Sequence, residues 1–345
     1  MAQALRADAV FEGGGVKGIG LVGALEVAEE RGYEWVNVAG TSAGAIVASL
    51  VAAHYTAAEI KGIMEGLDYR KFQDPGIVDS IPVIGPLISL GIEKGIYEGQ
   101  YLHDLLSDLL ARKEVTTFGD LVIPEYAQEE RYRYRLQVIA SDVSRGRMLI
   151  LPGDARKYGI NPDELSVALA VRMSMSIPFF FEPVTLKDAE TGQESYVVDG
   201  GLLSNYPIWL FDTPGPNPAW PTFGFRLIEG EEGPKTVRHQ IRGPLSLLAA
   251  LFFTAMEAHD ARYIEDQDWV RTIPIPSEGV SGTDFDLSKE AADRLYQAGR
   301  KAAEDFLAGW NFERYVTAYR QDDSKHGRKL ARQQLATTNQ VQKDS

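Results

Sequence analysis

The chain has 345 residues, of which 44% are hydrophobic, and a formal net charge of -14 at pH 7. This apolar content is enough for a sizeable core in one large or two medium domains. The absence of cysteine excludes disulfides, thiolate catalysis and cysteine-ligated metal sites. The acidic balance argues against broad nucleic-acid binding.

The sequence contains no apparent targeting or membrane-spanning segment. Residues 1–8 lack the apolar core of a secretory signal, and no stretch approaches the ~18 uncharged residues of a membrane span. We therefore expect a cytoplasmic protein that is not integral to a membrane. Its negative charge disfavours adsorption to strongly anionic membranes, but a lipid substrate and peripheral membrane contact remain compatible with the composition.

The first fifty residues predict a repeating strand and helix pattern. Residues 7–11 are typical of a strand, and the glycine-rich turn at 12–18 opens a helix that runs to about residue 31. An apolar strand at 35–39 then precedes a helix at 45–53. This order predicts an α/β fold with a mainly parallel sheet sandwiched by helices.

The middle of the chain adds further elements. Thr56 and Glu59 have the spacing of a helix capping box. The apolar residues 76–92, broken by prolines and glycines, fit either a buried loop or an interfacial lid. The expected elements after them are a core-facing helix at 101–110, a strand from 131 to 142 with a hairpin partner at 147–151, a helix at 165–175 started by Asn161 and Asp163, and strands at 183–186 and 195–198.

The last third of the chain shows fewer patterns. Beyond the proline-rich loop that starts near 211, we expect a strand at 222–227 and helices at 245–263 and 288–306. From residue 321 the chain is nearly free of large apolar residues, which is typical of a disordered or frayed tail.

A candidate nucleophile lies in Gly40-Thr41-Ser42-Ala43-Gly44, between the strand at 35–39 and the following helix. A G-x-S-x-G turn in this setting reverses the chain sharply enough to expose the serine hydroxyl, and only small flanking residues allow it. The helix behind Ser42 would direct its N-terminal N–H groups towards an oxyanion.

A serine nucleophile needs a base, and the histidines are poor candidates. None of the five lies in a strand-end loop, although His239 and His259 follow Asp199 in the order of an α/β-hydrolase triad. Asp199 ends an apolar strand and precedes Gly200 and Gly201, which is where open α/β sheets place their sites. A carboxylate within hydrogen-bond reach can serve as the base, while a plain turn remains the alternative for Asp-Gly-Gly.

The loop from Gly13 to Gly18 also matches the dinucleotide fingerprint G-x-G-x-x-G. That fingerprint expects an acidic residue at the end of the second strand, where this chain has Gly40-Thr41-Ser42 instead. Backbone N–H groups at a helix N-terminus beside this turn suit an oxyanion better than a pyrophosphate.

Together, Glu12 to Gly18 (EGGGVKG), Gly40 to Gly44 (GTSAG) and Asp199 to Gly201 (DGG) resemble the patatin-like phospholipase family. The resemblance covers about residues 7–210 and includes Gly95 to Gly99, 168–183 and Asn205 to Pro207. It implies hydrolysis of lipid acyl esters by a Ser-Asp dyad, without a catalytic histidine, a metal or another cofactor.

The resemblance also implies a role for each matched residue. Ser42 corresponds to the nucleophile and Asp199 to the base. The oxyanion loop corresponds to Gly13, Gly14, Gly15 and Gly18, to which we add the Ala43 N–H. Glu12 and Lys17 replace the aspartate and arginine that many members carry.

We therefore expect a catalytic domain at 7–210, a C-terminal extension at 211–320 packed on the same core, and a polar tail at 321–345. The expected activity is that of a lipid acyl hydrolase of the phospholipase A, lysophospholipase or lipid esterase type. A lipid acyltransferase that uses the same dyad and a non-catalytic lipid or nucleotide binder are the alternatives.

Overall fold

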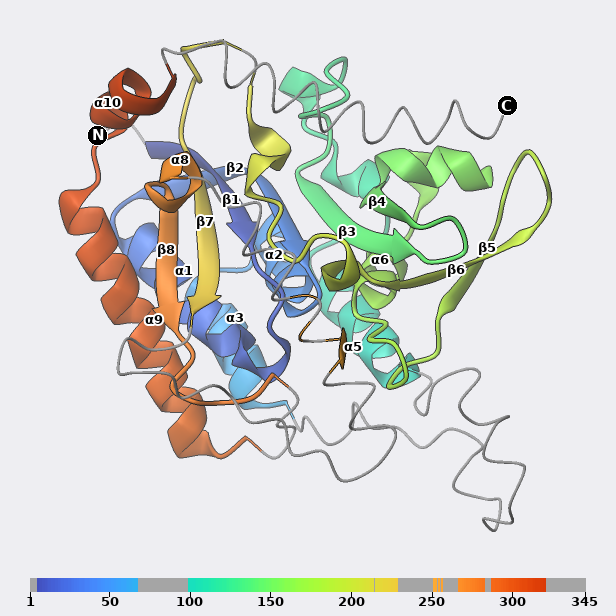
Figure 1. Cartoon of the computed structure of the whole chain (residues 1–345), viewed down its shortest axis with the longest axis horizontal. Coiled ribbons are helices and arrows are strands. Elements are labelled where there is room, and N and C mark those ends of the chain that lie inside the picture. Colours follow the sequence, from blue (N-terminus) through green and yellow to red (C-terminus); the bar gives the residue numbers. More distant parts are fainter. Residues whose placement is uncertain are drawn as a thin grey trace.

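In the computed structural model, the described residues are 5–67, 99–213, 215–228, 251, 252, 254, 256, 266–282 and 287–320. Within these ranges, eight strands form one sheet in the order β5-β6-β3-β2-β1-β7-β8, and β4 pairs with β3 (Figure 1). The strands are β1 (Leu5–Phe11), β2 (Tyr33–Thr41), β3 (Leu136–Asp142), β4 (Arg147–Leu151), β5 (Val184–Lys187), β6 (Glu194–Asp199), β7 (Thr222–Ile228) and β8 (Thr272–Pro276).

The sheet is mostly parallel at its centre. Strands β3, β2, β1, β7 and β8 run parallel to one another. Strands β4 and β6 are antiparallel to β3, and β5 is antiparallel to β6. The predicted α/β class with a mainly parallel sheet is therefore confirmed. Because consecutive parallel strands need a crossover, helices connect them.

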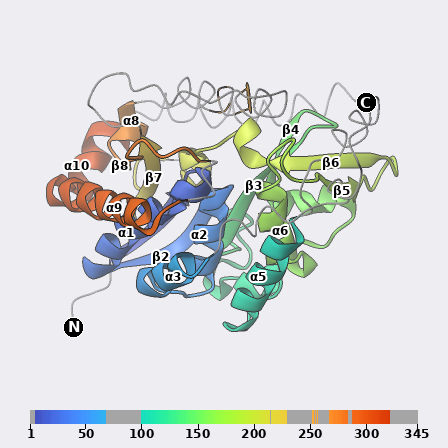
Figure 2. The same ribbon diagram turned by 90° about the horizontal axis from the view of Figure 1, so that it is seen from below.

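The helices of the described residues include four of ten residues or more. They are α1 (Gly18–Glu30), α2 (Ala43–Ala52), α3 (Ala57–Glu65), α5 (Gln100–Ala111), α6 (Val167–Ser174), α8 (Asp266–Trp269), α9 (Lys289–Gly309) and α10 (Phe312–Tyr315). Figure 2 shows α3 and α5 on the same side of β2. No helix in the described ranges is both long and apolar enough to cross a membrane.

The sheet separates two cores because alternate residues of a strand face opposite sides. Phe11 of β1 contributes to the larger core, which also contains buried residues of α1, α2, α5 and α9. Val10, the preceding residue, packs on the other face with Ala39, Ile139 and the segment Tyr206 to Phe211. The chain that follows Asp199 therefore crosses the second face of the sheet.

Most predicted elements are present, with two differences. The strand expected from 131 to 142 starts only at Leu136, so its first five residues were predicted wrongly. Arg131 instead donates hydrogen bonds to the Trp209 and Leu210 carbonyls. The helix expected from residue 165 starts at Val167, where the Ser166 side chain accepts the Leu169 N–H. Asn161 caps a separate 3-10 turn, Pro162–Glu164.

The sequence patterns also did not predict β8, whose sequence is Thr-Ile-Pro-Ile-Pro. Proline cannot donate to a ladder, but β8 is an edge strand, where proline is tolerated. The segment 76–92 and the tail from 321 lie outside the described residues, as does most of the helix expected at 245–263.

Candidate active site

Ser42 lies at the junction of β2 and α2 and has the backbone conformation of a nucleophile elbow. Its φ of 52° and ψ of -127° are strained for a residue with a side chain. A Cβ on Gly40 would lie 2.2 Å from the Gly44 carbonyl oxygen, and one on Gly44 would lie 2.3 Å from the Phe11 carbonyl oxygen. Only glycine fits at both positions, which explains the spacing seen in the sequence.

Asp199 is brought to this elbow by β6. The Ser42 hydroxyl donates a 2.7 Å hydrogen bond to Oδ2 of Asp199, across 157 residues of sequence. The other carboxylate oxygen accepts the Gly201 N–H at 2.8 Å, which fixes the orientation of the group. A Cβ on Gly200 would lie 2.3 Å from the Ile139 carbonyl oxygen, so the turn after Asp199 can approach β3 only as glycine.

The environment of Asp199 makes it a stronger base than a free aspartate. The side chain is 1% exposed, and its burial raises the pKa to about 7, while the hydrogen bonds from Ser42 and Gly201 act in the opposite direction. Among the residues that the structure describes, no cation contributes to this shift. A carboxylate with a pKa near neutrality suits general base catalysis better than one near 4.

The glycine-rich loop lies directly against the elbow. A Cβ on Gly13 would lie 3.1 Å from Cβ of Ser42 and 2.2 Å from Oδ1 of Asn205. Asn205 holds this loop from two sides, since its carbonyl accepts the Gly13 N–H at 3.2 Å and its Nδ2 donates to the Gly13 carbonyl at 3.0 Å. Asn205 is therefore a positioning residue for the loop.

The hydrogen bonds of the loop divide its N–H groups into two sets. The N–H groups of Gly13, Val16 and Gly18 donate to Asn205, Gly282 and Gly15. Within the described part of the chain, those of Gly14, Gly15 and Ala43 donate to no group. The Gly13 and Gly18 N–H groups are therefore already used in hydrogen bonds within the protein.

Two further residues that local patterns did not reveal contact Ser42. The Ser174 hydroxyl accepts the Ser42 N–H at 2.8 Å, and the Met175 sulfur lies 3.5 Å from the Ser42 hydroxyl oxygen. Ser174 is the last residue of α6 and Met175 follows it, in a segment whose methionines resemble core residues in sequence. Only the packing of α6 against α2 brings them to the site.

The histidines in the described ranges lie elsewhere. His54 follows α2 at its far end, and His103 is on α5, where its Nδ1 contacts Asp104. His239, His259 and His326 lie outside the described residues. Among the residues that the structure describes, no group of three or more histidine and carboxylate side chains could hold a metal ion.

Two known proteins are similar in sequence to this chain over most of its length. The chain is 42% identical over 306 residues to the uncharacterized protein YqhO of Bacillus subtilis, covering 88% of this chain and 99% of YqhO. It is 26% identical over 296 residues to an uncharacterized protein of Acanthamoeba polyphaga mimivirus, covering 85% of this chain and 90% of that protein.

Two solved structures are similar to this chain. VipD of Legionella pneumophila superposes with a TM-score of 0.52 at 19% identity, over 88% of this chain and 66% of VipD. ExoU of Pseudomonas aeruginosa, solved as a complex with SpcU, gives a TM-score of 0.47 at 18% identity, over 92% of this chain and 53% of that chain. This chain therefore spans less than two thirds of either protein.

The family profile of the patatin-like phospholipases matches residues 9–212, which include the glycine-rich loop, the elbow and Asp199. The fold is the three-layer α/β/α arrangement of that family. The chain belongs to the patatin-like phospholipase family of lipid hydrolases.

Proposed function

We propose that this protein is a lipid acyl hydrolase in which Ser42 is the nucleophile and Asp199 is the only side-chain base. The observation that carries this proposal is the 2.7 Å hydrogen bond from the Ser42 hydroxyl to a buried carboxylate with a pKa of about 7. The substrate would be a phospholipid, lysophospholipid or other lipid ester, and the enzyme would act at a lipid surface without inserting into it.

In the first half of the reaction, the Ser42 oxygen attacks the acyl carbonyl carbon while Asp199 accepts the hydroxyl proton. The N–H groups of Gly14, Gly15 and Ala43 would stabilise the negative charge that develops on the carbonyl oxygen. Asp199 then gives its proton to the leaving alcohol as the carbon–oxygen bond breaks. The products of this half are a free lysolipid or alcohol and an ester of Ser42.

In the second half, a water molecule attacks the acyl group while Asp199 accepts one of its protons. Collapse of the intermediate releases the fatty acid and returns the proton to the Ser42 oxygen. Because the same carboxylate serves both halves, the dyad needs no second base. Access of an alcohol instead of water to the acyl-enzyme would give acyl transfer, the alternative that the same geometry allows.

The test is covalent labelling followed by turnover. We expect a fluorophosphonate probe to label Ser42, and peptide mapping to place the adduct there. Ser42→Ala should abolish both labelling and hydrolysis of phospholipid vesicles, and Asp199→Asn should reduce both by more than about 10³-fold. Ser107→Ala, on α5, is the matched control and should behave as the wild type.

A non-catalytic binder would leave Ser42 unlabelled, and that result would overturn the proposal. Addition of lysolipid as an acyl acceptor separates the two enzymatic outcomes. Free fatty acid as the main product identifies a hydrolase, whereas new diacyl lipid as the main product identifies a transferase.

A further inference from the structure

A cavity lies on the face of the sheet that is covered by the segment Tyr206 to Phe211, away from Ser42. It has a volume of about 200 Å³, and we name it the rear cavity. It is lined by Asp8, Tyr126, Glu129, Tyr132, Trp220 and Tyr315, together with Arg271, Arg320 and residues 211–213 and 218–222. Asp8 precedes Glu12 of the glycine-rich loop by four residues, or about 13 Å along an extended strand, so the rear cavity is distinct from the candidate active site.

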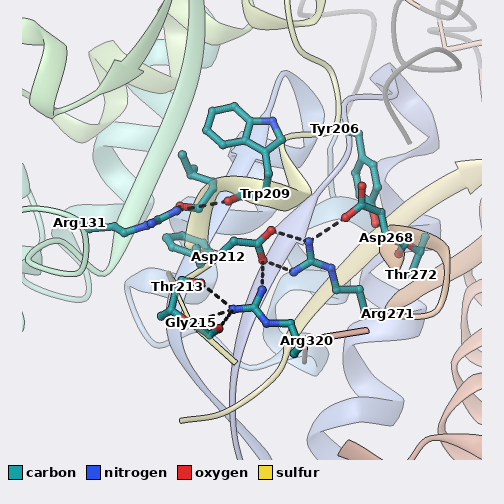
Figure 3. A network of polar contacts seen from close by, with 12 residues as sticks. Arg131, Tyr206, Trp209, Asp212, Thr213, Gly215, Asp268, Arg271, Thr272 and Arg320 are labelled. Atoms are coloured by element: carbon teal, nitrogen blue, oxygen red, sulfur yellow. Dashed lines mark hydrogen bonds and ion pairs between the residues drawn. The ribbon is translucent and has the colours of Figure 1, made fainter. Parts of the chain in front are cut away.

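The two arginines of the rear cavity are matched by carboxylates. Arg271 makes two hydrogen bonds to Asp212 and a 2.8 Å hydrogen bond to Asp268 (Figure 3). Arg320 lies 3.9 Å from Asp212 and donates to the carbonyl oxygens of Thr213 and Gly215. Arg271 and Arg320 are each 2% exposed, so these pairings hold them in the wall of the cavity.

The remaining charge of the rear cavity is negative. Asp8 is 3% exposed and accepts a hydrogen bond from the Asn37 backbone N–H, but it forms no ion pair with any residue of the described ranges. Glu129 lies at the exposed rim of the cavity and also forms no ion pair with any residue of the described ranges. Desolvation raises the pKa of Asp8 to about 7, although hydrogen bonding to the Trp220 side chain and to the Asn37 N–H acts in the opposite direction. The charge of nearby Asp212 contributes to the rise, and that of Arg131 opposes it. A buried carboxyl with a shifted pKa and open space beside it is typical of a ligand site.

The walls of the rear cavity are aromatic. The ring centroids of Tyr126 and Tyr132 are 6.1 Å apart, as are those of Tyr126 and Trp220, and the rings are inclined to one another. The Trp220 ring already attracts the guanidinium of Arg6, at 5.9 Å from its centroid. Aromatic faces beside a carboxylate are the combination that recognises organic ammonium ions, through cation–π attraction and charge.

We propose that the rear cavity is a second ligand site, and that it binds a small organic ammonium cation between the aromatic rings and Asp8. An anion is disfavoured because Arg271 and Arg320 already face Asp212 and Asp268. The cation could be a free amine or the ammonium group of a lipid headgroup. This proposal is independent of the activity at Ser42.

The test is calorimetric titration of the full-length protein at pH 8 with choline and with its neutral isostere 3,3-dimethyl-1-butanol. We expect saturable binding of choline and at least tenfold weaker binding of the alcohol. Asp8→Asn keeps the acceptor for the Asn37 N–H and should weaken choline binding at least tenfold, as should Trp220→Leu. Asp305→Asn, on the exposed side of α9, is the matched control and should bind as the wild type.

The wild-type protein provides a second measurement that needs no variant. Choline binding should be more than tenfold weaker at pH 5.5 than at pH 8, because Asp8 becomes protonated. The other charged or titratable groups around Asp8 are Asp212, Arg131, Tyr132, Glu129, Arg271 and Arg320. Of these, burial raises the pKa of Tyr132 to about 12, so its phenol does not titrate in this range.

Titration with glycerophosphocholine separates the two sources of the cation. Binding as tight as that of choline indicates a lipid headgroup, and binding restricted to choline indicates a free amine. The proposal is overturned if choline shows no saturable binding, if the neutral alcohol binds equally well, or if binding is the same at both pH values.

Discussion

At the scale of single residues, the feature that distinguishes the candidate site is the isolation of Asp199. It is buried, no cation in the described ranges contacts it, and its hydrogen bonds there come from the Ser42 hydroxyl and the Gly201 N–H. A triad aspartate instead orients a histidine and stays ionised throughout. Here the carboxylate itself would accept the proton, and burial brings its pKa closer to the range in which it can do so.

The first prediction concerns the pH dependence of hydrolysis. Asp199 must be ionised to act as a base, so kcat/KM should fall about tenfold per pH unit below pH 7 and reach a plateau above it. A water-soluble p-nitrophenyl ester should be the substrate, which avoids changes in vesicle charge. A profile that is flat from pH 5 to pH 8 would show that Asp199 is not the titrating base.

The second prediction concerns Asn205, which forms two hydrogen bonds with the backbone of Gly13. Asn205→Ala should lower kcat by about tenfold to a hundredfold with little change in KM, because the oxyanion donors lose their alignment rather than their binding surface. Asn161→Ala, at a cap on the protein surface, is the control variant. If Asn205→Ala lowers the melting temperature but leaves the kcat of the folded protein unchanged, Asn205 has a structural role alone.

At the scale of elements, α1 and α9 approach so closely that glycine is required on both. A Cβ on Gly23 of α1 would lie 2.1 Å from the Tyr296 carbonyl oxygen, and one on Gly299 of α9 would lie 2.0 Å from the Gly20 carbonyl oxygen. Helix propensity alone would favour alanine at these positions by up to ~1 kcal/mol. The close packing of the two backbones overrides that preference.

The third prediction uses two glycines of opposite surroundings. Gly23→Ala should destabilise the protein by about 2 to 4 kcal/mol, because either helix must move to admit the methyl group. Gly62→Ala on α3, where nothing lies within 4 Å of the new Cβ, should stabilise it by ~0.5 to 1 kcal/mol. Chemical denaturation measures the change in the free energy of unfolding for each variant. Changes of the same sign in both variants would refute this account of the packing.

At the scale of the whole molecule, the C-terminal part completes both the sheet and the site. Strands β7 and β8 extend the sheet beyond β1, and α9 packs against α1. The Gly282 carbonyl accepts the Val16 N–H at 3.0 Å, and a Cβ on Gly15 would lie 1.9 Å from the same oxygen. Residues after 211 therefore support the glycine-rich loop, although the division into domains at 210 stays a prediction.

The fourth prediction concerns the stability of the whole fold as a function of pH. Asp8 and Asp199 have folded-state pKa values of about 7, above the ordinary value of 3.8. Between these values the folded state binds more protons than the unfolded state, so each group lowers stability as the pH rises through this window, by up to about 4 kcal/mol.

Asp8→Asn removes one of these groups, so it should raise the free energy of unfolding at pH 8 and change it little at pH 4. Chemical denaturation at both pH values measures this difference. Asp305→Asn is the control, because Lys301 and Asp305 form an exposed pair. An equal effect of Asp8→Asn at the two pH values would contradict the buried, raised pKa.

The sequence by itself determined the fold class and the two residues that we propose as the dyad. Gly40 to Gly44 and Asp199 to Gly201 could be read locally because a sharp turn and a close approach of backbones demand glycine at fixed spacings. Strand and helix patterns were readable because their apolar periods reflect which face is buried. The alternating arginines of 131–135 were wrongly interpreted as part of a strand. The same alternation of residue types also occurs where arginine side chains donate hydrogen bonds to distant backbone carbonyls.

Only the tertiary structure decided which groups surround the dyad. Ser174, Met175 and Asn205 reach Ser42 or its loop through contacts across 132 to 192 residues of sequence. The pKa of Asp199, like that of Asp8, depends on burial by segments far away in the chain, and the rear cavity is formed by parts of the chain from Asp8 to Arg320. Desolvation and long-range packing leave no local periodic signal, because they depend on which surfaces meet rather than on which residues are adjacent.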